Sequence, residues 1–111
     1  MEITTNMAPQ VLAGKIALVT GAGQGNGRAI AIGLAKAGAQ VIVTDLVEKN
    51  AQSVAEEIGK AGGRAAHYGL NVTSAEQCRA LASQVAQDVG AVDILINNAG
   101  IIVREGLDSP Q

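Results

Sequence analysis

The sequence predicts an α/β fold in which a parallel β-sheet is covered by helices on both faces. Short runs of aliphatic residues, typical of strands buried on both faces, alternate with longer segments of helical periodicity. A glycine-rich turn joins the first aliphatic run to the first helical segment. Each later aliphatic run is followed by a polar residue, namely Asp45, Asn71 or Asn97.

Composition supports a single globular domain. The chain has 111 residues, of which 48% are hydrophobic and 16% are charged, so it is neither disordered nor large enough for several domains. Tyr68 is the only aromatic residue besides histidine, and the core must therefore be aliphatic. The net charge is −2 without a basic block, which argues against a nucleic-acid partner.

Cysteine content and hydropathy indicate the cellular compartment in which the protein works. The single cysteine, Cys78, excludes an internal disulfide and is compatible with a reducing compartment, so we expect a cytoplasmic protein. No apolar run approaches the ~20 residues needed to span a bilayer, so we expect no membrane association. Residues 1–14 are expected to be a polar leader, and residues 15–111 the folded domain.

The first structural unit runs from Lys15 to Asp45. The aliphatic run 16–19 predicts a buried strand, and apolar residues at helical spacing over 30–37 predict a helix. A second aliphatic run, 41–43, leads to Asp45. Between the first strand and the helix, glycine recurs at every second position, as Gly21, Gly23, Gly25 and Gly27.

This glycine turn has the properties of an anion site. Glycine adopts the backbone angles of a sharp strand-to-helix turn cheaply, and it lets a pyrophosphate approach the main chain. The first N–H groups of the following helix lack intrahelical partners and can donate to phosphate. Asp45 lies 18 residues after Gly27, near the ~20 expected for a carboxylate that binds the adenosine ribose. A carboxylate there would repel a 2′-phosphate, which favours NAD(H) over NADP(H).

The glycine run also admits other interpretations. The pattern G-x-G-x-x-G fails because Asn26 or Arg28 stands where the third glycine is needed, and the phosphate-loop pattern fails at Asn26 as well. A flexible glycine loop or a hairpin turn at Asn26-Gly27 is the structural alternative. A hairpin needs a second strand, whereas the residues after Gly27 are alanine-rich and helical.

Two further helices and two further strands are expected. Apolar spacing predicts a helix over 47–61 and another over 74–89, the latter capped by Thr73 or Ser74. A weak strand signal, interrupted by Gly69, predicts a strand at 64–70, and a stronger aliphatic run predicts one at 92–96. His67 and Cys78 are expected to be structural, since neither lies in a metal-ligand or nucleophile pattern. We therefore predict no catalytic residue and no metal ligand in this chain.

Three signals together resemble the amino-terminal half of the short-chain dehydrogenase/reductase family. They are T-G-x-x-x-G-x-G at 20–27, Asp45 after the second strand, and N-N-A-G at 97–100. The resemblance implies a truncated, doubly wound, Rossmann-like parallel sheet of order 3-2-1-4, with the first two helices on one face and the third on the other.

The resemblance also implies an NAD site. The glycine turn would hold the pyrophosphate, Asp45 the adenosine ribose, and the residues after the third and fourth strands the adenine and nicotinamide sides. Asn71 stands where the family commonly has Asp, and Asn26 where it commonly has Ile. The residues assigned to the site are Gly21, Gly23, Gln24, Gly25, Asn26, Gly27, Asp45, Leu46, Asn71, Val72, Asn98, Ala99 and Gly100.

The same resemblance implies that the parent protein is an oxidoreductase that would transfer hydride between NAD(H) and a small alcohol or carbonyl substrate. The family's Tyr-x-x-x-Lys pair, its serine and its upstream asparagine would fall beyond Gln111, so we expect the chain to lack the carboxyl-terminal catalytic half. The alternatives are a non-catalytic nucleotide-binding module and a structural oligomer paired through exposed edges. Because a single helix would cover the second face of the sheet, we expect apolar surface to remain exposed there, and we predict a homo-oligomer.

Overall fold

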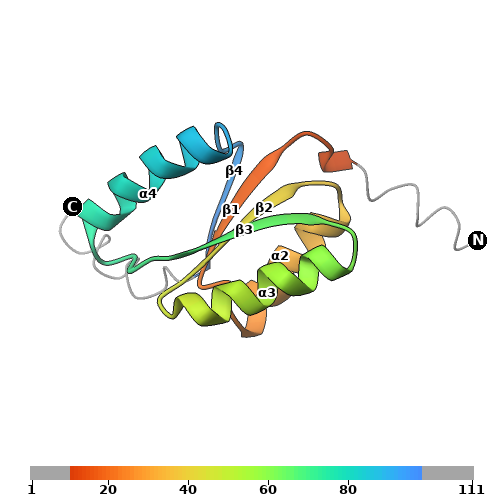
Figure 1. Cartoon of the computed structure of the whole chain (residues 1–111), viewed down its shortest axis with the longest axis horizontal. Helices are drawn as coiled ribbons and strands as arrows, with labels where there is room; N and C mark the ends of the chain where they lie inside the picture. The colour runs from red at the N-terminus through yellow and green to blue at the C-terminus, as the bar shows by residue number, and fades with distance from the viewer. Residues whose placement is uncertain (1–10, 99–111) are drawn as a thin grey trace, which may run out of the picture.

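The computed structural model describes residues 11–98, which form one four-stranded sheet between two helical layers (Figure 1). The predicted leader lies largely outside these residues, and so do Ala99 and Gly100. In chain order the elements are β1 (Ile16–Thr20), α2 (Gly25–Lys36), β2 (Gln40–Asp45), α3 (Glu48–Lys60), β3 (Arg64–Gly69), α4 (Ala75–Asp88) and β4 (Ile94–Asn97).

The sheet has the order β3-β2-β1-β4 with every pair parallel, which confirms the predicted topology. Parallel pairing brings the carboxyl ends of the strands to one edge. At this edge Thr20 pairs with Asn97, and Asp45 pairs with Gly69. The glycine turn, Asp45 and the segment after β3 are therefore neighbours, although the chain separates them.

The two faces of the sheet are covered unequally. Helices α2 and α3 lie on one face, and α4 lies alone on the other, as right-handed crossovers require (Figure 1). The core beneath α2 and α3 includes Val19, Val43 and Val54, which are at most 2% exposed. A smaller core lies under α4, around Ile42 and Val85.

Local sequence explains the helix ends. In α4 the Ser74 hydroxyl accepts from the Gln77 N–H at 3.1 Å, so Ser74 rather than Thr73 is the cap. In α3 the apolar stripe falls where periodicity predicts it, and its buried residues are Ala51, Val54, Ala55 and Ile58. Helix α2 begins earlier than expected, at Gly25 within the glycine run.

The fourth strand is shifted from its predicted span of 92–96 to Ile94–Asn97. Asp93 forms two hydrogen bonds with Ile16 and does not belong to the strand. Its N–H donates to the Ile16 carbonyl at 2.8 Å, and its carboxylate accepts from the Ile16 N–H at 2.9 Å. A carboxylate can satisfy a strand's first N–H in this way, which the apolar pattern of the run does not reveal.

The α4 face of the sheet carries an apolar cleft of about 390 Å³. It lies between α4, β1 and β4, and Leu18, Leu81 and Leu95 are among its lining residues. The Leu95 side chain is 65% exposed, which is unusual for a leucine in a parallel sheet. Within the described residues, no helix has the length and apolar character needed to cross a membrane.

Candidate cofactor-binding site

The glycine turn leads from β1 into the first turn of α2. Gly21 and Gly25 have φ angles of +61° and +59°, in the region that L side chains rarely adopt. Gln24 precedes the helix in an extended conformation, and its side chain makes no cap. Because no side chain caps them, the first N–H groups of α2 are open to an anion.

Gly27 is buried because the turn folds back onto it. A Cβ built on Gly27 would lie 2.1 Å from the Gly21 carbonyl oxygen and 2.7 Å from Asn98 Nδ2. By contrast, a Cβ on Gly33 of the same helix would meet nothing within 4 Å. The absence of a side chain at position 27 is therefore a requirement of packing in the turn.

Asp45 is held against the turn by backbone donors. Its Oδ1 accepts from the Gly23 N–H at 3.1 Å, and its Oδ2 accepts from the Val47 N–H at 3.0 Å. A Cβ on Gly23 would lie 2.8 Å from the Asp45 carboxyl carbon and 2.6 Å from Asn50 Cβ. The carboxylate therefore has a fixed orientation, and each oxygen keeps lone pairs for further donors.

The segment after β3 forms a compact turn. The Leu70 N–H donates to the Asp45 carbonyl at 2.9 Å, which joins this segment to the end of β2. Asn71 Oδ1 accepts from the Thr73 N–H at 3.0 Å and from the Thr73 hydroxyl at 2.6 Å. Leu46, at the end of β2, is 72% exposed. Polar and apolar groups thus lie beside Asp45 on its β3 side.

The end of β4 braces the glycine turn. Thr20 Oγ1 donates to Asn97 Oδ1 at 3.0 Å, which joins the carboxyl ends of β1 and β4. Asn98 Nδ2 donates to the Gly21 carbonyl at 3.1 Å, which leaves its Oδ1 for another partner. Ala99 and Gly100 lie outside the described residues.

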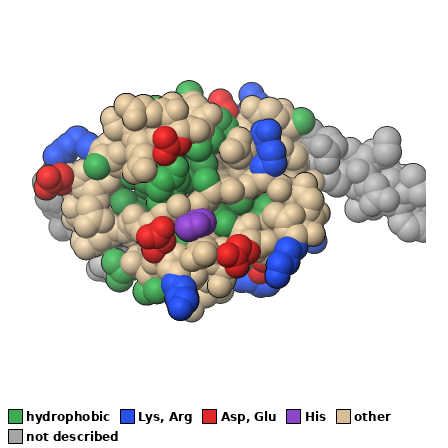
Figure 2. All heavy atoms as spheres, viewed as in Figure 1, with side chains coloured by type: hydrophobic (Ala, Val, Ile, Leu, Met, Phe, Trp, Pro, Cys, Tyr) green, Lys and Arg blue, Asp and Glu red, His purple; other side chains and the backbone are tan. Residues whose placement is uncertain are grey.

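His67 and Cys78 have structural neighbours, and the buried His67 Nδ1 makes no hydrogen bond among the described residues. His67 Nδ1 lies 3.3 Å from Glu48 Oε2 at the start of α3. Figure 2 shows the histidine between acidic side chains, below a hollow of hydrophobic groups. Cys78 is partly buried and packs against the core under α4, as predicted. Among residues 11–98, no group of three or more His, Cys, Asp or Glu side chains could hold a metal ion.

Tyr68 is not placed for proton transfer. Its hydroxyl donates to Oδ2 of Asp88, the last residue of α4, at 3.3 Å. Burial raises the pKa of the Tyr68 phenol above its ordinary value of 10.0, and the adjacent Asp88 carboxylate raises it further. The phenol therefore stays protonated at neutral pH.

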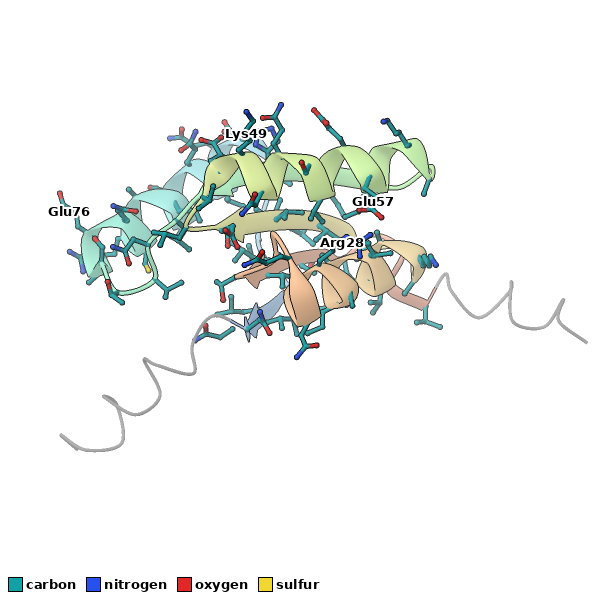
Figure 3. All side chains as sticks on the ribbon, turned by 90° about the horizontal axis from the view of Figure 1, so that it is seen from below. Arg28, Lys49, Glu57 and Glu76 are labelled. Carbon is teal, nitrogen blue, oxygen red and sulfur yellow. The ribbon has the colours of Figure 1, made fainter. Side chains whose placement is uncertain are left out.

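An ion pair crosses between the helices that flank the turn. Arg28, in the first turn of α2, faces Glu57 of α3 (Figure 3), and its Nε donates to Glu57 Oε1 at 3.0 Å while a second nitrogen contacts Oε2. The guanidinium is thus turned toward α3. It is occupied there by a carboxylate, so it does not serve as an unpaired phosphate ligand.

Sequence patterns missed three supporting residues. The Thr44 hydroxyl, fully buried, donates to the Val19 carbonyl at 2.9 Å. Asn50 packs beside Gly23, and Gln77 Oε1 accepts from the Asn71 N–H at 3.0 Å. Only Gln77 gave a signal, since it stands three residues after the helix cap. The other two act through contacts between segments distant in sequence.

A family model described as short chain dehydrogenase matches residues 15–109. The chain belongs to the short-chain dehydrogenase family. The resemblance drawn from the T-G-x-x-x-G-x-G turn, Asp45 and N-N-A-G is thereby confirmed.

Curated members of the short-chain dehydrogenase family match most of the chain. It is 46% identical over 89 residues to 7alpha-hydroxysteroid dehydrogenase of Escherichia coli strain K12. It is 45% identical over 93 residues to hydroxynaphthalene reductase-like protein Arp2 of Metarhizium guizhouense. These matches cover 80% and 83% of the chain but 35% of each relative, so the chain spans about a third of their length.

Solved structures of short-chain dehydrogenases share the fold. A hydroxysteroid dehydrogenase from Escherichia coli superposes with a TM-score of 0.77 at 42% identity, over 83% of this chain and 39% of that one. A protein provisionally assigned as D-mannonate oxidoreductase from Haemophilus influenza superposes with a TM-score of 0.76 at 35% identity, over 81% and 32%. That second structure contains bound NAD.

Proposed function

We propose that residues 15–111 form the NAD(H)-binding domain of an oxidoreductase that transfers hydride between NAD(H) and a small alcohol or carbonyl substrate. The observation that carries the proposal is the position of Asp45. Its carboxylate is fixed against the glycine turn by the N–H groups of Gly23 and Val47. An anion site and a fixed ribose acceptor, side by side at the carboxyl edge of a parallel sheet, suit an adenine dinucleotide.

Different groups of residues would contact different parts of the cofactor. The glycine turn, with Gln24 and Asn26, would hold the pyrophosphate on the N-terminus of α2. Asp45 would accept from the ribose hydroxyls, and its charge would repel a 2′-phosphate. Leu46, Asn71 and Val72 would flank the adenine, while Asn98, Ala99 and Gly100 would line the nicotinamide side. Bound NAD would supply the hydride acceptor, and these residues would position it.

Binding and turnover should separate in this chain. We expect the 111-residue chain to bind NAD but not to oxidise alcohols measurably, because Tyr68 is held by Asp88 and no described residue offers a proton-transfer group beside Asn98. Isothermal titration with NAD measures the binding, and the appearance of NADH absorbance measures turnover. Absence of NAD binding would overturn the proposed function. Turnover that survives purification would overturn the assignment of no catalytic residue.

The alternative function is a module that binds a nucleotide or pairs with a second copy. The exposed apolar cleft beside β4 favours the pairing. Within the described residues β4 pairs only with β1, so its other edge is open to a second strand. Cytoplasmic location stays a prediction from the single cysteine.

We expect the chain to form a homo-oligomer through the cleft or the β4 edge at micromolar concentration. Replacement Leu95→Lys should shift the light-scattering mass toward the monomer, because the 65% exposed Leu95 side chain would be buried in the pair. Val11→Lys is the control, since Val11 is 75% exposed but does not line the cleft. A monomeric wild-type chain would contradict the expectation. Ile94 is a poorer choice, because it packs against the core beneath α2.

A further inference from the structure

An ion pair joins α2 to α3 beside a gap between the two helices. Arg28 Nε donates to Glu57 Oε1 at 3.0 Å, and a second guanidinium nitrogen donates to Oε2, so the contact is bidentate (Figure 3). A cleft of about 230 Å³ lies between the carboxyl-terminal parts of the helices, and Ile32, Ala35, Ile58 and Ala61 are among its lining residues. Because apolar side chains leave this space unfilled, the position of α2 relative to α3 depends strongly on the ion pair.

Arg28 connects the glycine turn to α3 through its main chain and its side chain. Its N–H donates to the Gln24 carbonyl at 3.3 Å, which closes the first turn of α2. The N–H groups of residues 25–27, which precede this bond, have no acceptor within the helix. Their direction follows the orientation of the first turn, and the guanidinium of Arg28 joins that turn to Glu57.

Helix α3 also contacts the glycine turn near its own start. Asn50 lies in the first turn of α3, and its Cβ would be 2.6 Å from a Cβ built on Gly23. Gly23 in turn donates its N–H to Asp45 Oδ1 at 3.1 Å. Glu57 lies about two helical turns further along α3. Two separated contacts from one helix restrict both the position and the tilt of the turn and of α2.

We propose that Glu57 is a positioning residue for nucleotide binding, which acts through Arg28 to hold the first turn of α2 in the orientation that its free N–H groups need to meet a pyrophosphate. The inference rests on the proposed function, because it needs the pyrophosphate at the N-terminus of α2. The guanidinium is turned toward α3, so the pair acts on the nucleotide through the direction of main-chain donors.

Charge alone predicts the opposite effect of removing Glu57. A carboxylate near an anion site repels the anion, so its loss should strengthen nucleotide binding. The loss would also release the Arg28 guanidinium, which could then attract phosphate. A positioning role predicts weaker binding instead, because the first turn of α2 is no longer restrained. The sign of the change in affinity therefore decides between the two roles.

The test is titration calorimetry of NAD into the full 111-residue chain and its Glu57→Gln variant at low ionic strength. We expect Glu57→Gln to raise the dissociation constant about fourfold, in keeping with the loss of a well-oriented, partly exposed pair. Arg28→Met should have a similar effect, and the double variant should bind no more weakly than either single variant, because each change removes the same contact. High salt should narrow the difference between wild type and Glu57→Gln, since it screens exposed charges.

Glu56→Gln is the matched control. Glu56 carries the same charge on the exposed side of α3, and its carboxylate accepts from Gln52 of the same helix at 3.2 Å. Its replacement should leave the dissociation constant unchanged. Amide hydrogen exchange gives a second measurement without nucleotide, in which the Gly23 and Arg28 N–H groups should exchange about fourfold faster in Glu57→Gln but not in Glu56→Gln.

Unchanged or tighter NAD binding by Glu57→Gln would overturn the inference and leave the proposed function intact. An equal weakening in Glu56→Gln would also overturn it, since the net charge of α3 would then be the cause. A purely structural pair would lower the free energy of unfolding in urea without changing the dissociation constant of the folded chain, which again contradicts a positioning role. Failure of the wild-type chain to bind NAD would overturn the proposed function itself, and the positioning role with it.

Discussion

Gly27→Ala is expected to disrupt the glycine turn and to abolish NAD binding. The added methyl group would lie 2.1 Å from the Gly21 carbonyl oxygen, a main-chain atom that cannot rotate away. The α2 helix must then move from β1, and the Asn98 amide loses its place on Gly21. We expect a loss of about 3 kcal/mol or more in the free energy of unfolding, measured by urea denaturation.

Gly33→Ala provides a matched control on the same helix. A Cβ at position 33 meets nothing within 4 Å, and the residue is exposed in the middle of α2. Alanine there should stabilise the chain by about 0.5–1 kcal/mol, because glycine is a poor helix former. Equal effects of the two substitutions would contradict the close approach at Gly27.

Asp45→Ala should lower NAD affinity by about 30-fold, or about 2 kcal/mol, through loss of hydrogen bonds from the ribose to a charged acceptor. The substitution also leaves the Gly23 and Val47 N–H groups without the carboxylate. Combined with Leu46→Arg, it should reverse the preference toward NADP, since a guanidinium beside the ribose binds a 2′-phosphate.

The measurement is the ratio of NAD to NADP dissociation constants from titration calorimetry. Asp88→Ala is the control, because it removes the same charge from α4, where Asp88 contacts Tyr68. An unchanged ratio in the Asp45 variants would show that this carboxylate does not face the ribose. A similar shift in Asp88→Ala would point to net charge instead of position.

Much of the fold could be predicted because strands buried on both faces produce unbroken aliphatic runs. The runs at 16–19 and 41–43 gave β1 and β2 nearly to their ends, and periodicity gave α3 within a residue at each end. Boundaries failed where a side chain replaced the expected partner. Asp93 binds Ile16, and β4 therefore begins at residue 94. Helix α2 begins at Gly25, inside the glycine run, where no apolar periodicity marks the start of a helix.

The candidate site was predictable only in part. The types of residue that a dinucleotide needs follow one another in the chain, so Gly21 to Gly27 and Asp45 could be recognised by spacing. The contacts that hold them were not visible, because they join residues distant in sequence. The Asn98 side chain was expected near the nicotinamide, and the structure shows its NH₂ group on the Gly21 carbonyl. The direction of the Asn71 amide likewise depends on Thr73.

The brace at the end of β4 has a consequence for the order of folding. Three side-chain bonds, from Ile16 to Asp93, Thr20 to Asn97 and Asn98 to Gly21, each span 77 residues. Closing so long a loop carries an entropic cost that the nearer contacts among β1, β2 and β3 do not bear. The first three strands can therefore assemble before the turn acquires its final shape. We expect the glycine turn to acquire its final shape last, and fraying of β4 to loosen the turn while most of the sheet persists.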